Sequence, residues 1–126
     1  TVSFIATLNE LQTRTDVVAS YNPDLQYYTT HAQAFTSKLI TNPDSHLNIA
    51  FVFSNAKVVE ILETDNRFVF LVELLGFDNA RIAMEYRGNI DIEVGKVFRI
   101  FADVAGTYPS GDSTYPHLIA RFIYNA

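Results

Sequence analysis

The sequence predicts a mainly β protein in which an N-terminal helical segment packs on a five-stranded barrel. Two observations lead to this fold class. After residue 49, apolar and polar residues alternate with the two-residue period of half-buried strands, and clusters of turn-forming residues separate the runs. Before residue 47, apolar residues recur at intervals of three and four, which is typical of helices. We therefore expect residues 1–47 to form the helical segment and residues 48–126 the barrel, within one compact domain.

Two helices are expected before the barrel. Residues 1–20 carry apolar side chains near helical spacing and predict the first helix. Asn22 is a good capping residue and Pro23 suits a first helical turn, so we expect a second helix from Pro23 to Ile40. Its apolar stripe comprises Leu25, Tyr28, Ala32, Phe35 and Leu39. Asn42 to Leu47 is expected to be a short turn or a single helical turn.

Three strands are expected to follow as a meander. Ile49 to Glu63 is a long run that small and polar residues interrupt at Ser54 to Ala56, which predicts one strand with a sharp bend. Arg67 to Leu75 is almost continuously apolar and predicts a buried strand. Ala80 to Arg87 alternates, so one face of this strand is expected to meet water. That face consists of Arg81, Ala83, Glu85 and Arg87. Residues 88–94 read as a connector.

The last two strands form the clearest unit, a hairpin between Gly95 and Tyr124. Both arms alternate with a period of two. The first arm is expected to place Phe98, Ile100, Ala102 and Val104 on one face, and the second to place Leu118, Ala120, Phe122 and Tyr124 opposite His117, Ile119, Arg121 and Ile123. Thr107 to Tyr115 is rich in proline, glycine, serine and aspartate, and predicts a long loop between the arms.

Five strands with a long, bent first strand are typical of the OB-fold, a Greek-key barrel. Several short motifs also resemble the OB-like (tRNA-anticodon-binding-like) domains of bacterial exported proteins and lipoproteins. The similarity covers about residues 35–126 and is carried by Leu39-Ile-Thr-Asn-Pro-Asp44, Lys57-Val-Val-Glu-Ile-Leu62, Gly95-Lys-Val, Ala105-Gly-Thr-Tyr108 and Pro116-His-Leu-Ile-Ala-Arg121. These motifs are structural, so the resemblance implies the fold rather than a catalytic activity. Because the family consists of exported proteins and lipoproteins, it also implies a place in the cell envelope. His46-Leu47-Asn48 replaces lysines that are usual in the family, which removes basic charge from a place where an anion would bind.

Composition excludes several kinds of site. The chain has no cysteine, so it has no disulfide, no thiol nucleophile and no cysteine-ligated zinc. Its three histidines, at 31, 46 and 117, lack metal-site spacing, and no nucleophile-elbow or phosphate-binding glycine motif occurs. We therefore expect no catalysis, cofactor or metal. No apolar run approaches the about 20 residues of a membrane-spanning helix. The sequence begins at Thr1, and we expect that a signal segment has been removed during export.

The expected ligand face combines basic and aromatic side chains on the last three strands and the loop between the final two. OB barrels bind extended polymers with such side chains. The candidate ligand-binding residues are Arg81, Tyr86, Arg87, Arg99, Tyr108, Tyr115 and Arg121. The alternative interpretation is that Tyr86 belongs to the core and that the arginines only line a wet face.

Two functions compete. The first is a non-enzymatic, exported or envelope-associated module that binds another protein or an envelope polymer. The second is an oligonucleotide-binding protein, which the net charge of −5 opposes. A continuous positive stripe along Arg81, Arg87, Arg99 and Arg121 would favour nucleic acid. Arginines neutralised by Glu73, Glu85 and Asp103 would favour the first function.

Overall fold

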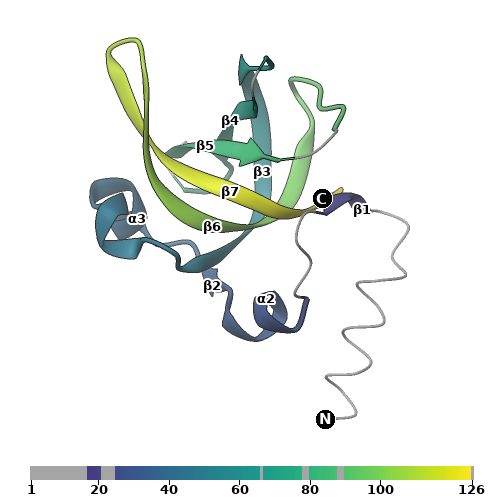
Figure 1. The fold of residues 1–126 in the computed structure, drawn as a ribbon, viewed down its shortest axis with the longest axis vertical. Coiled ribbons are helices and arrows are strands. Elements are labelled where there is room, and N and C mark those ends of the chain that lie inside the picture. Colours follow the sequence, from purple (N-terminus) through teal and green to yellow (C-terminus); the bar gives the residue numbers. More distant parts are fainter. Residues whose placement is uncertain (1–16, 21–24, 66, 78–79, 88–89, 126) are drawn as a thin grey trace.

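The computed structural model describes residues 17–20, 25–65, 67–77, 80–87 and 90–125, and within them the predicted five-stranded barrel is confirmed (Figure 1). Its strands are β3 (Ala50–Glu63), β4 (Phe68–Leu74), β5 (Ala80–Tyr86), β6 (Val97–Ser110) and β7 (Ser113–Asn125). Neighbouring strands pair in the cyclic order β3, β4, β5, β7, β6 and back to β3. The β5–β7 pair is parallel and the other four are antiparallel. The connectivity is that of an OB-fold-like Greek-key barrel.

The bend in β3 is what allows the barrel to close. The first half of this strand pairs with β6 and its second half pairs with β4. The register with β6 shifts between Phe53 and Ala56, at the bend that the sequence predicted. Ser54 and Asn55 are exposed at this point, which explains why polar residues interrupt an otherwise apolar strand.

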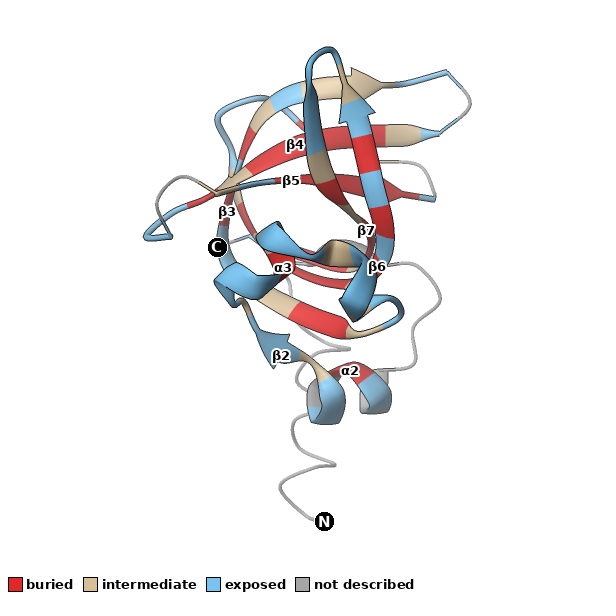
Figure 2. Ribbon diagram, turned by 90° about the vertical axis from the view of Figure 1, so that its left-hand side faces the viewer, coloured by how far each residue is buried: buried red, intermediate tan, exposed pale blue. Residues whose placement is uncertain are grey.

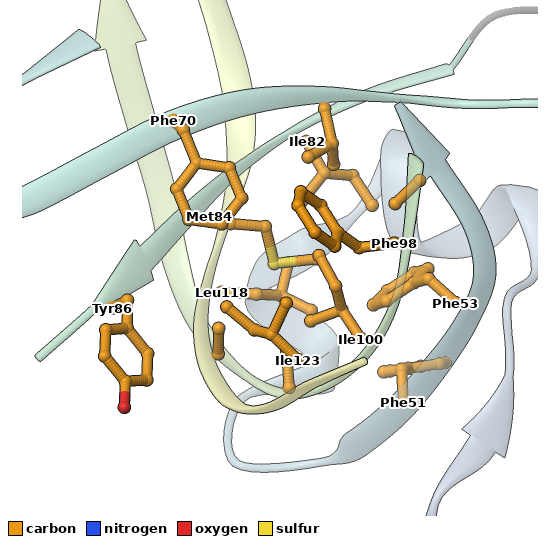
Figure 3. Close-up of a cluster of buried hydrophobic side chains, with 14 of the residues drawn as sticks. Phe51, Phe53, Phe70, Ile82, Met84, Tyr86, Phe98, Ile100, Leu118 and Ile123 are labelled. Carbon is orange, nitrogen blue, oxygen red and sulfur yellow. The ribbon is translucent and has the colours of Figure 1, made fainter. Parts of the chain in front are cut away.

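The barrel interior is a single apolar cluster to which every barrel strand contributes. Figure 3 shows Phe70 of β4, Met84 of β5, Ile100 of β6 and Leu118 of β7 pointing toward one another, and all four are fully buried. Burial at this level agrees with the apolar periodicity of the sequence. The interior is therefore packed with side chains rather than hollow.

A bulge in β7 changes which residues of the hairpin face inward. Phe101 lies opposite Phe122, but Ala102 lies opposite Ala120, so Arg121 is an extra residue in β7. The predicted alternation of the second arm is therefore wrong beyond Ala120. Ile123 joins the interior cluster, whereas Phe122 packs outside the barrel.

The long loop predicted between the two arms is also wrong. β6 continues to Ser110 and β7 resumes at Ser113, so only Gly111 and Asp112 form the turn. Gly111 has a φ of 60°, which a two-residue hairpin turn requires and which glycine adopts without strain. The outer part of this hairpin projects beyond the barrel as a curved two-stranded ribbon (Figure 1).

The predicted helices are largely replaced by shorter elements. Residues 17–20 form strand β1 (Val17–Ser20), which pairs with β7, and the remainder of the first predicted helix lies outside the described residues. The second is divided into α2 (Leu25–His31), strand β2 (Gln33–Ala34) and α3 (Ser37–Thr41). Its expected start at Pro23 also lies outside the described residues. The predicted turn at 42–47 is confirmed as the 3-10 helix η1 (Pro43–His46).

Packing explains why the second helix is divided. A straight helix over residues 23–40 would be about 27 Å long. In the structure Tyr28 packs outside the barrel with Phe101 and Phe122, whereas Leu39 joins the interior cluster. A break between them lets both side chains be buried, and β2 gains parallel strand pairing with β3 at the break. Figure 2 shows the resulting pattern, with buried residues concentrated on the barrel strands and exposed residues on β2 and most of α3.

Candidate functional site

Three of the four arginines expected on the ligand face form ion pairs with acidic side chains. Arg81 lies 3.3 Å from Glu73 and Arg87 lies 2.6 Å from Glu85. Arg121 lies 2.9 Å from Asp103. These three acids are the ones that the sequence indicated as possible neutralising partners. Each of the three guanidinium groups thus contacts a carboxylate of the same chain.

Arg99 differs from the other three arginines. Its guanidinium carbon lies 5.4 Å from the centre of the Phe101 ring, on the same strand. The buried Nε atom has no hydrogen-bond partner among the described residues. Arg99 therefore adds a cation to the outer surface of β6 rather than extending a continuous basic stripe.

The seven candidate residues do not form one face. Arg87, Tyr108 and Tyr115 lie around one cluster on the outside of β4 and β5, which is described below. Arg81 lies near the opposite end of β5. Tyr86 is buried with the interior cluster, as the alternative interpretation held (Figure 3). Arg121 lies beneath α2, where its Nε and the Tyr28 hydroxyl both donate to Asp103 Oδ2.

The cluster on the outside of β4 and β5 is centred on Glu85, of which only 3% is exposed. Glu85 Oε1 accepts hydrogen bonds from Arg67 Nη1 at 3.1 Å and from His117 Nε2 at 2.9 Å. Glu85 Oε2 accepts one from Arg87 Nε at 2.6 Å. Since a carboxylate only accepts, His117 Nε2 carries the proton. We call these residues, with Glu63 and Tyr108, the Glu85 cluster.

Tyr108 of the hairpin packs over the outer side of the Glu85 cluster. Its hydroxyl donates to the Glu63 carboxylate, and its ring lies 5.7 Å from the His117 ring and 5.4 Å from the Arg67 guanidinium. The same ring covers Val69 and Ala83, which form a small buried apolar cluster outside the barrel. The sequence predicted that Ala83 and Glu85 would meet water. That prediction is wrong, because the projecting hairpin folds over this face.

The electrostatics of the Glu85 cluster follow from burial and from these partners. Burial acts to raise the pKa of Glu85, but Arg87 and His117 outweigh it and lower that pKa below its usual value. Burial lowers the pKa of His117, and the attraction of Glu85 compensates only in part. The hydrogen bond from Tyr108 lowers the pKa of Glu63. The cluster thus pairs two arginines with two carboxylates around an uncharged histidine at neutral pH.

A second feature is an apolar groove made of two adjoining pockets, and Phe35 and Phe77 form a wall that both pockets share. Two adjoining pockets of about 450 and 290 Å³ both contact these two residues, whose rings lie 5.0 Å apart. The groove extends over α3, the bend of β3 and the turn between β4 and β5, and 51% of Phe77 is exposed. The other lining residues are Ala34, Ser37, Ile40, Thr41, Val52, Phe53, Ser54, Asn55, Leu74, Leu75 and Ala80. Among the residues that the structure describes, no charged side chain lines the groove.

Sequence reasoning missed both features. It placed Phe35 on a helix stripe packed against the barrel and treated residues 76–79 as a turn only. An aromatic residue at Phe77, directly after a glycine in a turn, was the available indication of an exposed apolar site. For the Glu85 cluster, no sequence pattern indicates that His117 contacts Glu85, 32 residues earlier.

No family model, curated protein or solved structure matches the chain. The resemblance to OB-like domains of exported proteins therefore stays a prediction. Among the described residues, no group of three or more histidine, aspartate or glutamate side chains is placed to hold a metal ion. Over the same part of the chain, no helix has the length and apolar character needed to span a membrane.

Proposed function

We propose that this chain is a non-enzymatic OB-like module that binds a protein partner. The observation that carries the proposal is the contrast between its two kinds of surface. Arg81, Arg87 and Arg121 are paired with carboxylates, whereas the described lining of the groove at Phe35 and Phe77 is uncharged. A surface of this kind favours an apolar segment of a protein over a polyanion.

Nucleic acid is disfavoured by the same contacts. A phosphate would have to compete with Glu73, Glu85 or Asp103 for a guanidinium, and the chain has a net charge of −5. Each displaced carboxylate would then lie near the incoming phosphate, and like charges repel.

A role without catalysis is supported by the state of the Glu85 cluster. Both carboxylate oxygens of Glu85 accept hydrogen bonds from the protein, and the side chain is buried. A general acid or base has to reach a substrate proton directly or through one water. Glu85 instead accepts from Arg67, Arg87 and His117, and His117 Nε2 donates to Glu85.

The resemblance to exported domains supports a place in the cell envelope. The coding sequence upstream of Thr1 tests this part of the proposal. A signal peptide with a lipobox cysteine before Thr1 is the expected result, and an upstream cytoplasmic domain would contradict it.

The binding role is tested by photo-crosslinking in cells of the source organism. A photoreactive phenylalanine analogue is placed at Phe77 in the groove and, in a second variant, at Thr114 in the exposed part of the hairpin. We expect at least one position to capture a discrete protein that can be identified by mass spectrometry. Crosslinks to nucleic acid at both positions, or no discrete protein at either, would contradict the proposal.

A further inference from the structure

The wall of the barrel is interrupted beside the groove. On one side of β3, strand β2 pairs with Phe51 and Val52, and β4 pairs only from Ala56 onward. Ser54 and Asn55 have no residue opposite them in either neighbouring strand among the described residues. One backbone bond crosses the interruption, from the Leu75 amide to the Asn55 carbonyl at 3.0 Å.

The interruption is bordered by an edge strand. β2 consists of Gln33 and Ala34, which are both exposed and pair in parallel with β3. Within the described chain, β2 is the last strand on its side of the sheet. Unpaired main-chain groups on an edge strand are the usual template for an added strand from another molecule. Ala34 also lines the smaller pocket, so the edge and the groove are continuous.

We propose that the Phe35 and Phe77 groove binds an extended, uncharged peptide segment of a partner protein, which adds main-chain hydrogen bonds at the β2 edge and the bend of β3. This inference rests on the proposed function, because it specifies how the protein partner is held. Two apolar side chains of the peptide occupy the two pockets, on either side of the shared Phe35 and Phe77 wall. In an extended segment these are residues i and i+2, which point to the same face about 6.8 Å apart.

The chemistry of the lining selects this occupant. An ionised side chain or a phosphate would lose its water without meeting an opposite charge among the described lining residues, which are all uncharged. The hydroxyls of Ser37, Thr41 and Ser54 and the Asn55 amide supply neutral hydrogen-bonding groups along the rim. Alternating pockets beside main-chain groups fit a peptide better than a single acyl chain, which would use the pockets and leave the main-chain groups unused.

The inference is tested by selecting peptides from a displayed library of random twelve-residue sequences on the complete chain. We expect the selected peptides to lack charges in a central segment that carries apolar residues at i and i+2. Labelled peptides of this kind are then measured by fluorescence anisotropy against wild type, Phe77→Ser and Val94→Ser. Val94 is the matched control, because it is apolar, 59% exposed and outside the groove.

The expected result is that Phe77→Ser weakens binding at least about tenfold, whereas Val94→Ser changes it less than about twofold. Methylating one backbone nitrogen in the central segment should weaken binding by a similar factor, because it removes a main-chain donor. Circular dichroism melting of Phe77→Ser checks that the exposed substitution leaves the fold intact.

Four results would overturn the inference, three with the isolated protein and one in cells. One is that no peptide is enriched on the wild type relative to the Phe77→Ser variant. Another is that the enriched peptides are charged or lack apolar residues at i and i+2. The third is concentration-dependent dimerisation of the wild type that Phe77→Ser abolishes, which would assign the groove to a second copy. A protein captured in cells from Thr114 but not from Phe77 would leave the binding role intact and reject only the groove.

Discussion

At the scale of single residues, the interior of the barrel dominates stability. Phe70 is fully buried in β4 and contacts the interior cluster to which the other barrel strands contribute (Figure 3). Removing a buried phenylalanine side chain typically costs about 3–5 kcal/mol, through lost burial and the cavity that remains. We expect Phe70→Ala to lower the free energy of unfolding by this amount, measured by urea denaturation. The exposed Phe77→Ala is the control, and an equal loss for both would contradict the assignment of Phe70 to the core.

The charge of Glu85 is expected to set the protonation of its neighbour. Glu85 acts to raise the pKa of His117 against the lowering effect of burial. Glu85→Gln keeps the size of the side chain and removes the charge, so the pKa of His117 should fall further. The titration of the His117 ring by NMR measures this, with the exposed Glu93→Gln as a control. A His117 pKa that stays constant or rises would show that the two groups do not interact as the geometry indicates.

The same substitution is expected to destabilise the fold. Arg67, Arg87 and His117 would lose an ionised acceptor, and a hydrogen bond to a charged group contributes a net stabilisation of about 1.5–3 kcal/mol when it is well buried. Arg67 and Arg87 are about half exposed and can regain water, so we expect a total loss of about 1–3 kcal/mol. Chemical denaturation of Glu85→Gln beside Glu93→Gln measures it, and unchanged stability would contradict a structural role for the cluster.

The residue scale is also where sequence reasoning was least complete. The alternation of residues 80–87 correctly placed Ile82 and Met84 inward. It could not show that Glu85 is buried, because the partners that cover it come from segments 18 and 32 residues away. Burial of a polar side chain outside a barrel depends on how the hairpin curves, and local periodicity does not report that.

At the scale of elements, the hairpin packs on the outside of β4 and β5 through ionisable side chains, which include His117 and Glu85. His117 has a lowered pKa in the folded state, so below about pH 6.5 the unfolded chain takes up a proton that the folded chain resists. The lowered pKa values of Glu85 and Glu63 act in the same direction below their ordinary value of 4.5. The stability that these three groups contribute is therefore fully present above about pH 7 and decreases in two stages as the pH falls.

Denaturation at a series of pH values checks this prediction. His117→Gln should remove the decrease that begins near pH 6.5, and it should leave the decrease below about pH 4.5 in place. His46→Gln is the matched control, because the His46 ring hydrogen-bonds to Ser45 and Asn42 rather than to the Glu85 cluster, and this substitution should leave both stages unchanged. A stability that rises as the pH falls from 7 to 5 would contradict the packing of His117 beside Glu85.

The elements differ in how far the sequence could predict them. The bend in β3 was predictable because polar residues at Ser54 and Asn55 interrupt an apolar strand. The extended hairpin was not, because Pro109 and Pro116 normally disfavour strands. They are tolerated here in the part of β6 and β7 that projects beyond the closed barrel as two strands. The division of the second helix depended on the edge of β3, which no property of residues 23–40 reveals.

At the scale of the whole molecule, three arginines of the barrel are paired with carboxylates, and the described lining of the apolar groove is uncharged. Nine basic side chains face fourteen acidic ones, and three of the four arginines suggested for a ligand face contact carboxylates. A barrel of this topology would bind nucleic acid through freely available cations and aromatic rings. The fold of this chain therefore does not by itself determine the function that such a fold most often suggests.

The most direct measurement of this claim is fluorescence anisotropy with labelled poly-dT and poly-U at about 50 and 150 mM salt. Binding that uses several arginines must weaken with salt, by about 0.7 log units per contact for each tenfold rise with a single strand. We predict no binding tighter than about 10 μM at the higher salt, far weaker than typical specific affinities. Submicromolar binding at about 150 mM salt that is lost in the Arg81→Glu/Arg99→Glu double variant would contradict the account.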